Sequence, residues 1–169
     1  MSQPLVSSVD SGALIEAMPC PMTAERTEPP EQDLIEAYRL LDEAVDAFNC
    51  ADPERMAAVN HYPHIRITGP QVVIWNTPEE YAQSNSREKL LSKDRTTTFS
   101  GWKTSQWEWR KLIQHSPETM HFAVAFSRLD ADGNKLAMFE SFRILTKKNG
   151  RWGQQARSSF AGIADGGSY

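Results

Sequence analysis

One carboxylate in the C-terminal half of the chain has the surroundings that acid–base chemistry needs. Glu140 lies two residues after Met138 and two before Phe142, and in a β-strand this spacing places the three side chains on one face. Desolvation of a carboxylate favours its neutral form, so a Glu among apolar side chains can donate or accept a proton near neutral pH. We therefore expect Glu140 to act as a general acid or base, unless the other face of the strand is the buried one or a bulge turns the side chain outward.

Two further side chains, His64 and Tyr38, could handle protons beside Glu140. Imidazole titrates near neutrality, and His64 stands with His61 at the start of a short apolar segment. An exposed or capping role is the alternative, and it fits His61 better than His64. Tyr38 lies in the apolar row of a long helical segment, where its phenol could donate a hydrogen bond to a ligand carbonyl or to the backbone. Glu140, His64 and Tyr38 thus form a candidate catalytic set for cofactor-free isomerisation, dehydration or cyclisation.

The candidate ligand-binding residues come from the same alternation. We take the bulkier apolar row of each expected strand as the buried one. This choice selects aromatic and polar side chains that would line a cavity, namely Trp107, Trp109, Phe142, Gln154 and Ser158. Trp107 and Trp109 would share a face, where they could stack on a flat ligand or fill the core.

The opposite rows carry basic and small side chains. Arg66, Arg143 and Arg157 fall there, and so does His121 among alanines. A row of small residues suits close packing of a second sheet, so we expect this face to form a homodimer. If the two faces are reversed, the alternative is a ligand pocket lined by Arg157 and Ser159.

Four long segments of alternating apolar residues can position these side chains. They are 102–115, 119–129, 135–146 and 151–161. Two of the three turns between them contain the Gly and Asn that tight hairpins require. We predict a consecutive antiparallel meander, and strands of this length must coil or bend.

Helical and short extended segments precede the meander. Apolar residues between 34 and 48 recur at steps of three and four, which predicts a helix that begins at Glu31. Asp52-Pro53 starts a short helix, 65–67 and 72–75 form a hairpin, and Thr77-Pro78 begins a more polar helix that ends near 91.

These elements predict an α+β domain over residues 31–162. In it, helices pack on the concave face of a cone-shaped, curved antiparallel sheet. We expect residues 1–30 to be a mobile leader and 163–169 a flexible tail.

Composition argues against several classes of function. The 169 residues carry a net charge of −4, which disfavours general nucleic-acid binding. Cys20 and Cys50 form no metal-ligand pattern with the histidines, so we expect a reducing compartment and neither a metal nor another cofactor. No apolar run approaches the ~20 residues of a membrane helix, and the N-terminal residues lack the basic start of a secretory signal. We expect a cytoplasmic protein.

The order of the elements and several short motifs resemble the nuclear transport factor 2-like superfamily and, within it, the SnoaL-like group. The motifs are Ala51-Asp52-Pro53, the segment 62–67, Asp130-Ala131-Asp132-Gly133 and Asn149-Gly150-Arg151-Trp152. The resemblance implies a cone-shaped fold that often dimerises sheet to sheet. It also implies a range of activities, from ketosteroid isomerases, dehydratases, epoxide hydrolases and polyketide cyclases to members without a reaction.

The positions that carry ketosteroid isomerase chemistry are not matched in this chain. By spacing, the oxyanion-donating tyrosine of those enzymes falls at Ala44, and their aspartate base falls near Ile67 or Thr68. The resemblance therefore implies the fold without that reaction. We expect an apolar cavity for a small hydrophobic or aromatic molecule, with acid–base catalysis in it; a non-catalytic ligand-binding or dimeric assembly module is the alternative.

Overall fold

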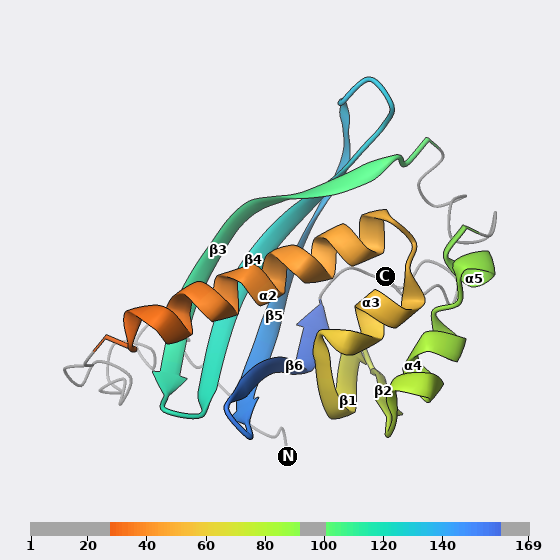
Figure 1. Cartoon of the computed structure of the whole chain (residues 1–169). Coiled ribbons are helices and arrows are strands. Elements are labelled where there is room, and N and C mark those ends of the chain that lie inside the picture. Colours follow the sequence, from red (N-terminus) through yellow and green to blue (C-terminus); the bar gives the residue numbers. More distant parts are fainter. Residues whose placement is uncertain (1–27, 92–100, 160–169) are drawn as a thin grey trace, which may run out of the picture.

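A single curved sheet with helices on one face makes up the part of the chain that the computed structural model describes, residues 28–91 and 101–159 (Figure 1). The strand order is β2-β1-β6-β5-β4-β3. The strands are β1 (Asn60–Thr68), β2 (Gln71–Trp75), β3 (Thr104–Ser116), β4 (Thr119–Leu129), β5 (Lys135–Lys148) and β6 (Arg151–Ser159). The predicted α+β class and the meander from β3 to β6 are confirmed, whereas β1 pairs with β6 in parallel.

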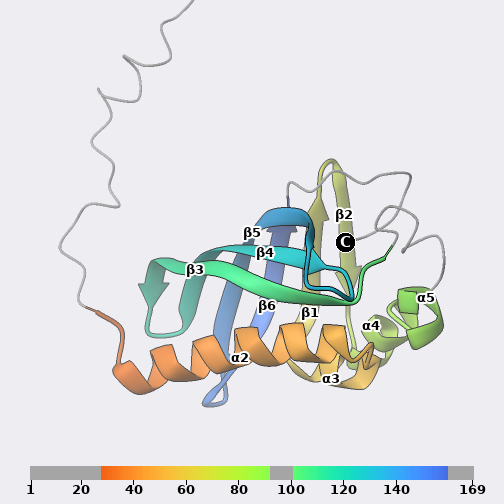
Figure 2. The ribbon, with the colours of Figure 1, turned by 90° about the horizontal axis from the view of Figure 1, so that it is seen from above.

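The long helix α2 (Glu31–Asn49) crosses the inner face of the sheet, and Figure 2 shows it on one side of all the strands. Near its C-terminal end lie α3 (Pro53–Ala58), α4 (Pro78–Ser84) and α5 (Arg87–Leu91). The expected caps are present: Asp52 accepts a hydrogen bond from the Arg55 amide, and Thr77 accepts one from the Glu80 amide. Within the described residues, no helix has the length and apolar character to span a bilayer.

The last helical segment is divided, although a single helix was predicted there. The side chain of Asn85 donates a hydrogen bond to the Tyr81 carbonyl, 2.9 Å away. An asparagine that binds the backbone in this way competes with the helical hydrogen bonds, so α4 ends at Ser84 and α5 begins at Arg87.

Two apolar clusters join the helices to the sheet. The larger one packs the face of α2 around Leu41 against the inner row of β4, where Met120, Phe122 and Val124 are fully buried. The smaller one joins the C-terminal end of α2 to α3, β2 and α4 around Met56 and Tyr81. The predicted inner row of β4 is therefore correct.

Bulges change which side chains face the helices in β3 and β6. In β3, Trp107 pairs with Phe126 and Trp109 with Ala125, so one extra residue lies between them. The two tryptophans consequently lie on opposite faces, and the prediction that they share one is wrong. In β6, a similar shift lies between Gln154 and Ala156. The side chains of β6 that face the helices are therefore the even-numbered ones before the shift and the odd-numbered ones after it.

The face of β5 that was predicted to be buried is the outer one. Leu145 and Arg143 face the helices, whereas Met138 is 53% exposed and Phe142 42%. Glu140 lies between these two residues and is exposed, and Ser158 on β6 pairs with Phe142. The predicted inward positions of Glu140, Phe142 and Ser158 are wrong, because the outer row of β5 carries apolar residues as large as those of the inner row.

Candidate functional site

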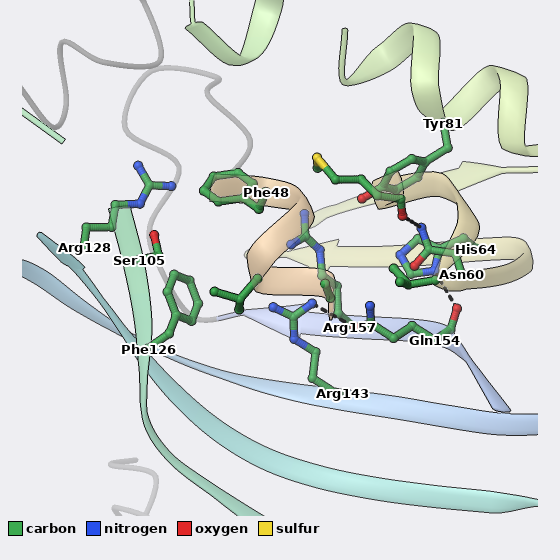
Figure 3. A pocket seen from close by; sticks show the side chains of 14 residues that line it. Phe48, Asn60, His64, Tyr81, Ser105, Phe126, Arg128, Arg143, Gln154 and Arg157 are labelled. Carbon is green, nitrogen blue, oxygen red and sulfur yellow. Dashed lines mark hydrogen bonds between the residues drawn. The ribbon is translucent and has the colours of Figure 1, made fainter. Parts of the chain in front are cut away.

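A cavity of about 60 Å³ lies between α2 and the inner face of the sheet (Figure 3). On α2 it is lined by Ala44, Val45 and Phe48. Ala44 and Val45 lie between the parts of the helix that enter the two apolar clusters, and Phe48 packs against the smaller cluster. The other lining residues are Met56, Val59, Asn60, His64, Tyr81, Ser105, Phe126, Arg128, Arg143, Gln154 and Arg157. None of the described lining residues is Asp or Glu, and three are Arg. The described lining is therefore largely apolar, as the sequence predicted, but it also carries arginines on one side, which the sequence analysis did not place there.

A row of arginines crosses three neighbouring strands on the inner face of the sheet. Arg143 on β5 pairs with Arg157 on β6, and Arg157 pairs with Arg66 on β1. Directly opposed side chains of adjacent strands have Cβ atoms about 5 Å apart, and like charges at this separation destabilise the sheet. Arg66 and Arg143 are nevertheless buried, with 2% and 9% of their surface exposed. Arg143 and Arg157 extend from neighbouring strands into the cavity (Figure 3).

Arg143 has a neutral hydrogen-bond partner. Its Nη1 donates to the Gln154 Oε1 at 3.2 Å, and its Nε has no hydrogen-bond partner among the described residues. Burial, and secondly the charge of Arg157, lower the pKa of Arg143 to about 9, against a smaller opposing effect of Tyr81. The guanidinium is still protonated at neutral pH. Burial also lowers the pKa of Arg157.

His64 is held at the cavity as a neutral imidazole. Its Nδ1 lies 3.0 Å from the backbone oxygen of Gln154, and because a carbonyl can only accept, Nδ1 carries the proton. The ring stacks on Trp75 and meets the edge of Tyr81. Burial, with a further contribution from Arg157, lowers the pKa of His64 to about 3. At neutral pH the Nε2 atom is therefore an acceptor, and the ring has no extra proton to give.

The structure brings two of the predicted site residues, His64 and Gln154, to the cavity. Tyr38 instead packs in the larger apolar cluster, with its ring 5.3 Å from that of Phe122 and under the Arg110 guanidinium. Trp107 packs at the edge of the same cluster, and Trp109 is 42% exposed on the outer face. The three candidate catalytic residues do not converge, because Glu140 is on the opposite side of the sheet from His64.

Sequence reasoning missed several residues that line the cavity. Arg157 appeared only in the alternative with reversed faces, and Arg143 was assigned to the dimer face. The available signal was the presence of arginine at equivalent positions of three expected strands, which is unusual for a solvent face that also carries Phe and Met. Tyr81, an aromatic residue within a polar helix, was a second signal. Among the described residues, no three His, Cys, Asp or Glu side chains gather as metal ligands would.

Comparison with known proteins identifies the fold of this chain. No protein-family model matches the chain, and no curated protein sequence does. Among solved structures, a cystatin-like protein of unknown function from Nostoc punctiforme superposes with a TM-score of 0.63 at 14% identity, over 82% of this chain and 97% of that one.

Two further structures give the same result. A ketosteroid isomerase-like protein from Erwinia carotovora has a TM-score of 0.55 and 16% identity, with 78% and 97% of the two chains covered. An NTF-2 like protein of unknown function from Shewanella oneidensis has a TM-score of 0.56 and 12% identity, with 76% and 98% covered. The resemblance expected from the sequence is confirmed at the level of the fold, and the chain has the cystatin-like fold of the nuclear transport factor 2-like proteins.

Proposed function

We propose that this protein binds a small molecule in the cavity between α2 and the sheet. The observation that supports the proposal is a set of buried polar side chains, Arg143, Gln154 and His64, around space that no described side chain fills. Burial of polar groups is unfavourable unless they are fully paired, and apolar residues at these positions would give a more stable core. A few converging polar groups in a largely apolar recess are typical of ligand sites.

The dimensions of the cavity limit the ligand. A cavity needs roughly 10–15 Å³ to hold one water, and sites for drug-sized ligands are several hundred Å³. With about 60 Å³ available, the enclosed part of the ligand is a small group of atoms. Phe48 and Phe126 also line the cavity, and they favour an apolar or aromatic portion in the ligand.

Binding without catalysis accounts for this geometry better than acid–base catalysis does. Catalysis by Glu140, His64 and Tyr38 would require the three side chains to face one space, whereas Glu140 is exposed on the outer face and Tyr38 packs in the core. His64 alone would be a weak base, because a general base works best when its pKa lies near the working pH, and burial lowers the pKa of His64 to about 3.

A cavity-filling variant tests the proposal. Ala44 lines the cavity on α2, and Ala58 is an exposed alanine on α3. Small-molecule fragments that bind the cavity should raise the thermal midpoint of unfolding of the wild type. We expect the same fragments to raise the midpoint of Ala58→Leu by an equal amount and to leave the midpoint of Ala44→Leu unchanged. Calorimetric titration of each variant measures the affinity. Unchanged binding to Ala44→Leu, in a variant that folds, would exclude the cavity as the site.

We also propose that the protein forms a homodimer through the outer face of the sheet. Ile67, Ile74, Trp109 and Met138 are exposed there, and monomeric proteins seldom expose several large apolar side chains on one face. Small residues such as Ala123 lie between them on β4 and allow a second sheet to approach closely. Light scattering during gel filtration tests this, with an expected mass of twice the 19.1 kDa of the chain.

A further inference from the structure

We propose that the ligand of the cavity is a small neutral alcohol or phenol, which donates a hydrogen bond to Nε2 of His64 and accepts one from the guanidinium of Arg143. This inference rests on the proposal that the cavity binds a small molecule, and it adds the chemical class of that molecule. It follows from the tautomer of His64, from the contacts that Gln154 makes with both side chains, and from a buried donor of Arg143.

His64 presents a hydrogen-bond acceptor at the cavity. Its Nδ1 lies 3.0 Å from the backbone oxygen of Gln154, which can only accept, so Nδ1 carries the proton and Nε2 carries the lone pair. The ring is 1% exposed and is held in place by Trp75 on its face and Tyr81 at its edge. In the described part of the chain, no residue donates to Nε2. Burial of an acceptor without a donor is unfavourable, and the O–H of a ligand would supply that donor.

This acceptor disfavours an acid as the ligand. At neutral pH a carboxylate has acceptor atoms only, so it would place its lone pairs against the lone pair of Nε2. Protonation of the ring would remove the conflict, but burial, and secondly the charge of Arg157, oppose it and lower the pKa of His64 to about 3. A hydroxyl group has no such conflict, because it is a donor as well as an acceptor.

Gln154 holds the acceptor of His64 and a donor of Arg143 at the same side of the cavity. Its backbone oxygen accepts from His64, and its side-chain Oε1 accepts from Nη1 of Arg143 at 3.2 Å (Figure 3). The Nε atom of Arg143 is buried and has no hydrogen-bond partner among the described residues. All three residues line the cavity. The polar side therefore offers one acceptor and one donor, which is the pair that a hydroxyl group can satisfy.

The remaining lining defines the body of the ligand. Val45, Phe48 and Phe126 form apolar walls. A volume of about 60 Å³ is several times the roughly 10–15 Å³ that one water needs, so it encloses a hydroxyl group and the carbon atoms next to it. The ligand is therefore a hydroxyl group on a small apolar or aromatic body, for which phenol is a suitable probe.

Phenol and fluorobenzene test the hydroxyl group directly, because they have nearly the same shape and only phenol has a donor. We expect phenol to bind the full-length wild type roughly 3- to 10-fold more tightly than fluorobenzene, the range for a hydrogen bond between neutral groups. Benzoate, which has no donor at neutral pH, should bind more weakly than phenol. Isothermal titration calorimetry at pH 7 and fixed ionic strength measures the three affinities.

Nitrogen-15 NMR of the histidine side chains locates the hydrogen bond without any variant. The resonance of an unprotonated ring nitrogen moves upfield when that nitrogen accepts a hydrogen bond. We expect phenol to move the Nε2 resonance of His64 upfield while Nδ1 stays protonated, and we expect fluorobenzene to leave it in place. An Nε2 resonance that is the same with and without bound phenol would overturn the role of His64.

Variants then assign the preference for phenol over fluorobenzene. In His64→Asn the amide N–H can replace Nδ1 as the donor to Gln154, but nothing replaces Nε2, so we expect the preference to disappear. In His64→Gln the longer amide reaches the position of Nε2, and part of the preference should return. Arg143→Met should weaken phenol binding by a similar factor of 3 to 10. The control is His115→Asn, a partly buried histidine near the end of β3, which should bind as the wild type does.

The outcomes separate this inference from the proposed function. If fluorobenzene binds as tightly as phenol, and Ala44→Leu abolishes the binding of both, the cavity binds small molecules and the hydroxyl assignment is wrong. If benzoate binds more tightly than phenol, the chemical class is wrong. If phenol does not bind the wild type, or if His64→Asn folds and keeps the full preference, the inference is overturned.

Discussion

His64 links the burial of a single side chain to the pH dependence of folding. Burial lowers its pKa in the folded protein to about 3, whereas an unfolded histidine has a pKa near 6.5. Between these pH values the unfolded chain binds the proton more readily, so protonation favours unfolding. The free energy of unfolding therefore decreases as the pH falls from about 6.5, by on the order of 1 kcal/mol per pH unit. His61, whose pKa burial lowers to about 4, acts in the same direction.

We expect His64→Gln to flatten this dependence. Glutamine does not titrate, so the variant lacks the coupling between protonation and unfolding, and its difference in stability from the wild type should shrink as the pH falls from 7 towards 4. Urea unfolding at several pH values measures the free energies. A His64 ring that titrates near pH 6.5 in NMR spectra of the folded protein would contradict the explanation.

Asp33 has the same sign of linkage as His64, but it acts at lower pH. Its Oδ1 accepts hydrogen bonds from Lys147 Nζ at 2.6 Å and from Trp152 Nε1 at 3.1 Å, which hold the beginning of α2 against β5 and β6. These bonds, the one from Lys147 first, lower the pKa of Asp33. A lowered carboxylate pKa stabilises the fold above the unfolded pKa of about 3.9, and this stabilisation is lost as the pH falls through the folded value.

We expect Asp33→Asn to reduce the free energy of unfolding by about 1–2 kcal/mol at pH 7. Asparagine can accept from Trp152 but leaves Lys147 without its anionic partner. The difference from the wild type should decrease at pH values below 4, where the wild-type carboxylate becomes protonated in the unfolded chain. Denaturant unfolding at pH 7 and below pH 4 measures both quantities, and a difference that is equal at the two pH values would exclude the ion pair as its cause.

The order and type of the elements could be predicted because each depends on a short stretch of sequence. Asp52-Pro53 and Thr77-Pro78 begin α3 and α4, and Asn149-Gly150 closes the hairpin between β5 and β6. The face that each strand buries could not be predicted. One extra residue in β6 reverses the alternation there, and the other neighbour of β6 at this point is β1, which is distant in sequence. The cavity shares this difficulty, since its lining extends from Ala44 to Arg157.

The junction of β1 and β6 depends on close packing around a glycine. A Cβ atom added to Gly153 would lie 2.5 Å from Cδ2 of His61. The His61 ring cannot easily move away, because it is 5% exposed and its Nδ1 is 2.9 Å from the Thr146 hydroxyl. Gly153 thus lets β6 lie close to β1 just before the bulge that turns Arg157 inward.

We expect Gly153→Ala to destabilise the protein by about 1–3 kcal/mol, the usual range for overpacking. Removing the His61 ring should relieve the clash, so the double variant with His61→Ala should be more stable than the sum of the single effects predicts. A double-mutant cycle from urea unfolding gives the coupling free energy, which should be about 1 kcal/mol or more. Additive effects would mean that the alanine clashes elsewhere.

In the described part of the chain, the helices cover one face of the sheet, and the other face carries exposed apolar side chains with no described helix over it. On the inner face, α2 buries Met120, Phe122 and Val124. On the outer face, Met138 and Ile74 are more than half exposed. The inner face therefore explains the monomer fold and the cavity, and the outer face is the surface on which association with a second copy would bury apolar area.

We expect Met138→Glu to weaken self-association by at least about tenfold, because a carboxylate would be desolvated between two apolar sheets. The matched control is Ile35→Glu, a large exposed apolar residue on α2, away from the outer face. Sedimentation velocity over a range of protein concentrations measures the change for each variant. A wild type that sediments as a single chain at every concentration would overturn the dimer, and an equal effect of the two substitutions would exclude the outer face as the interface.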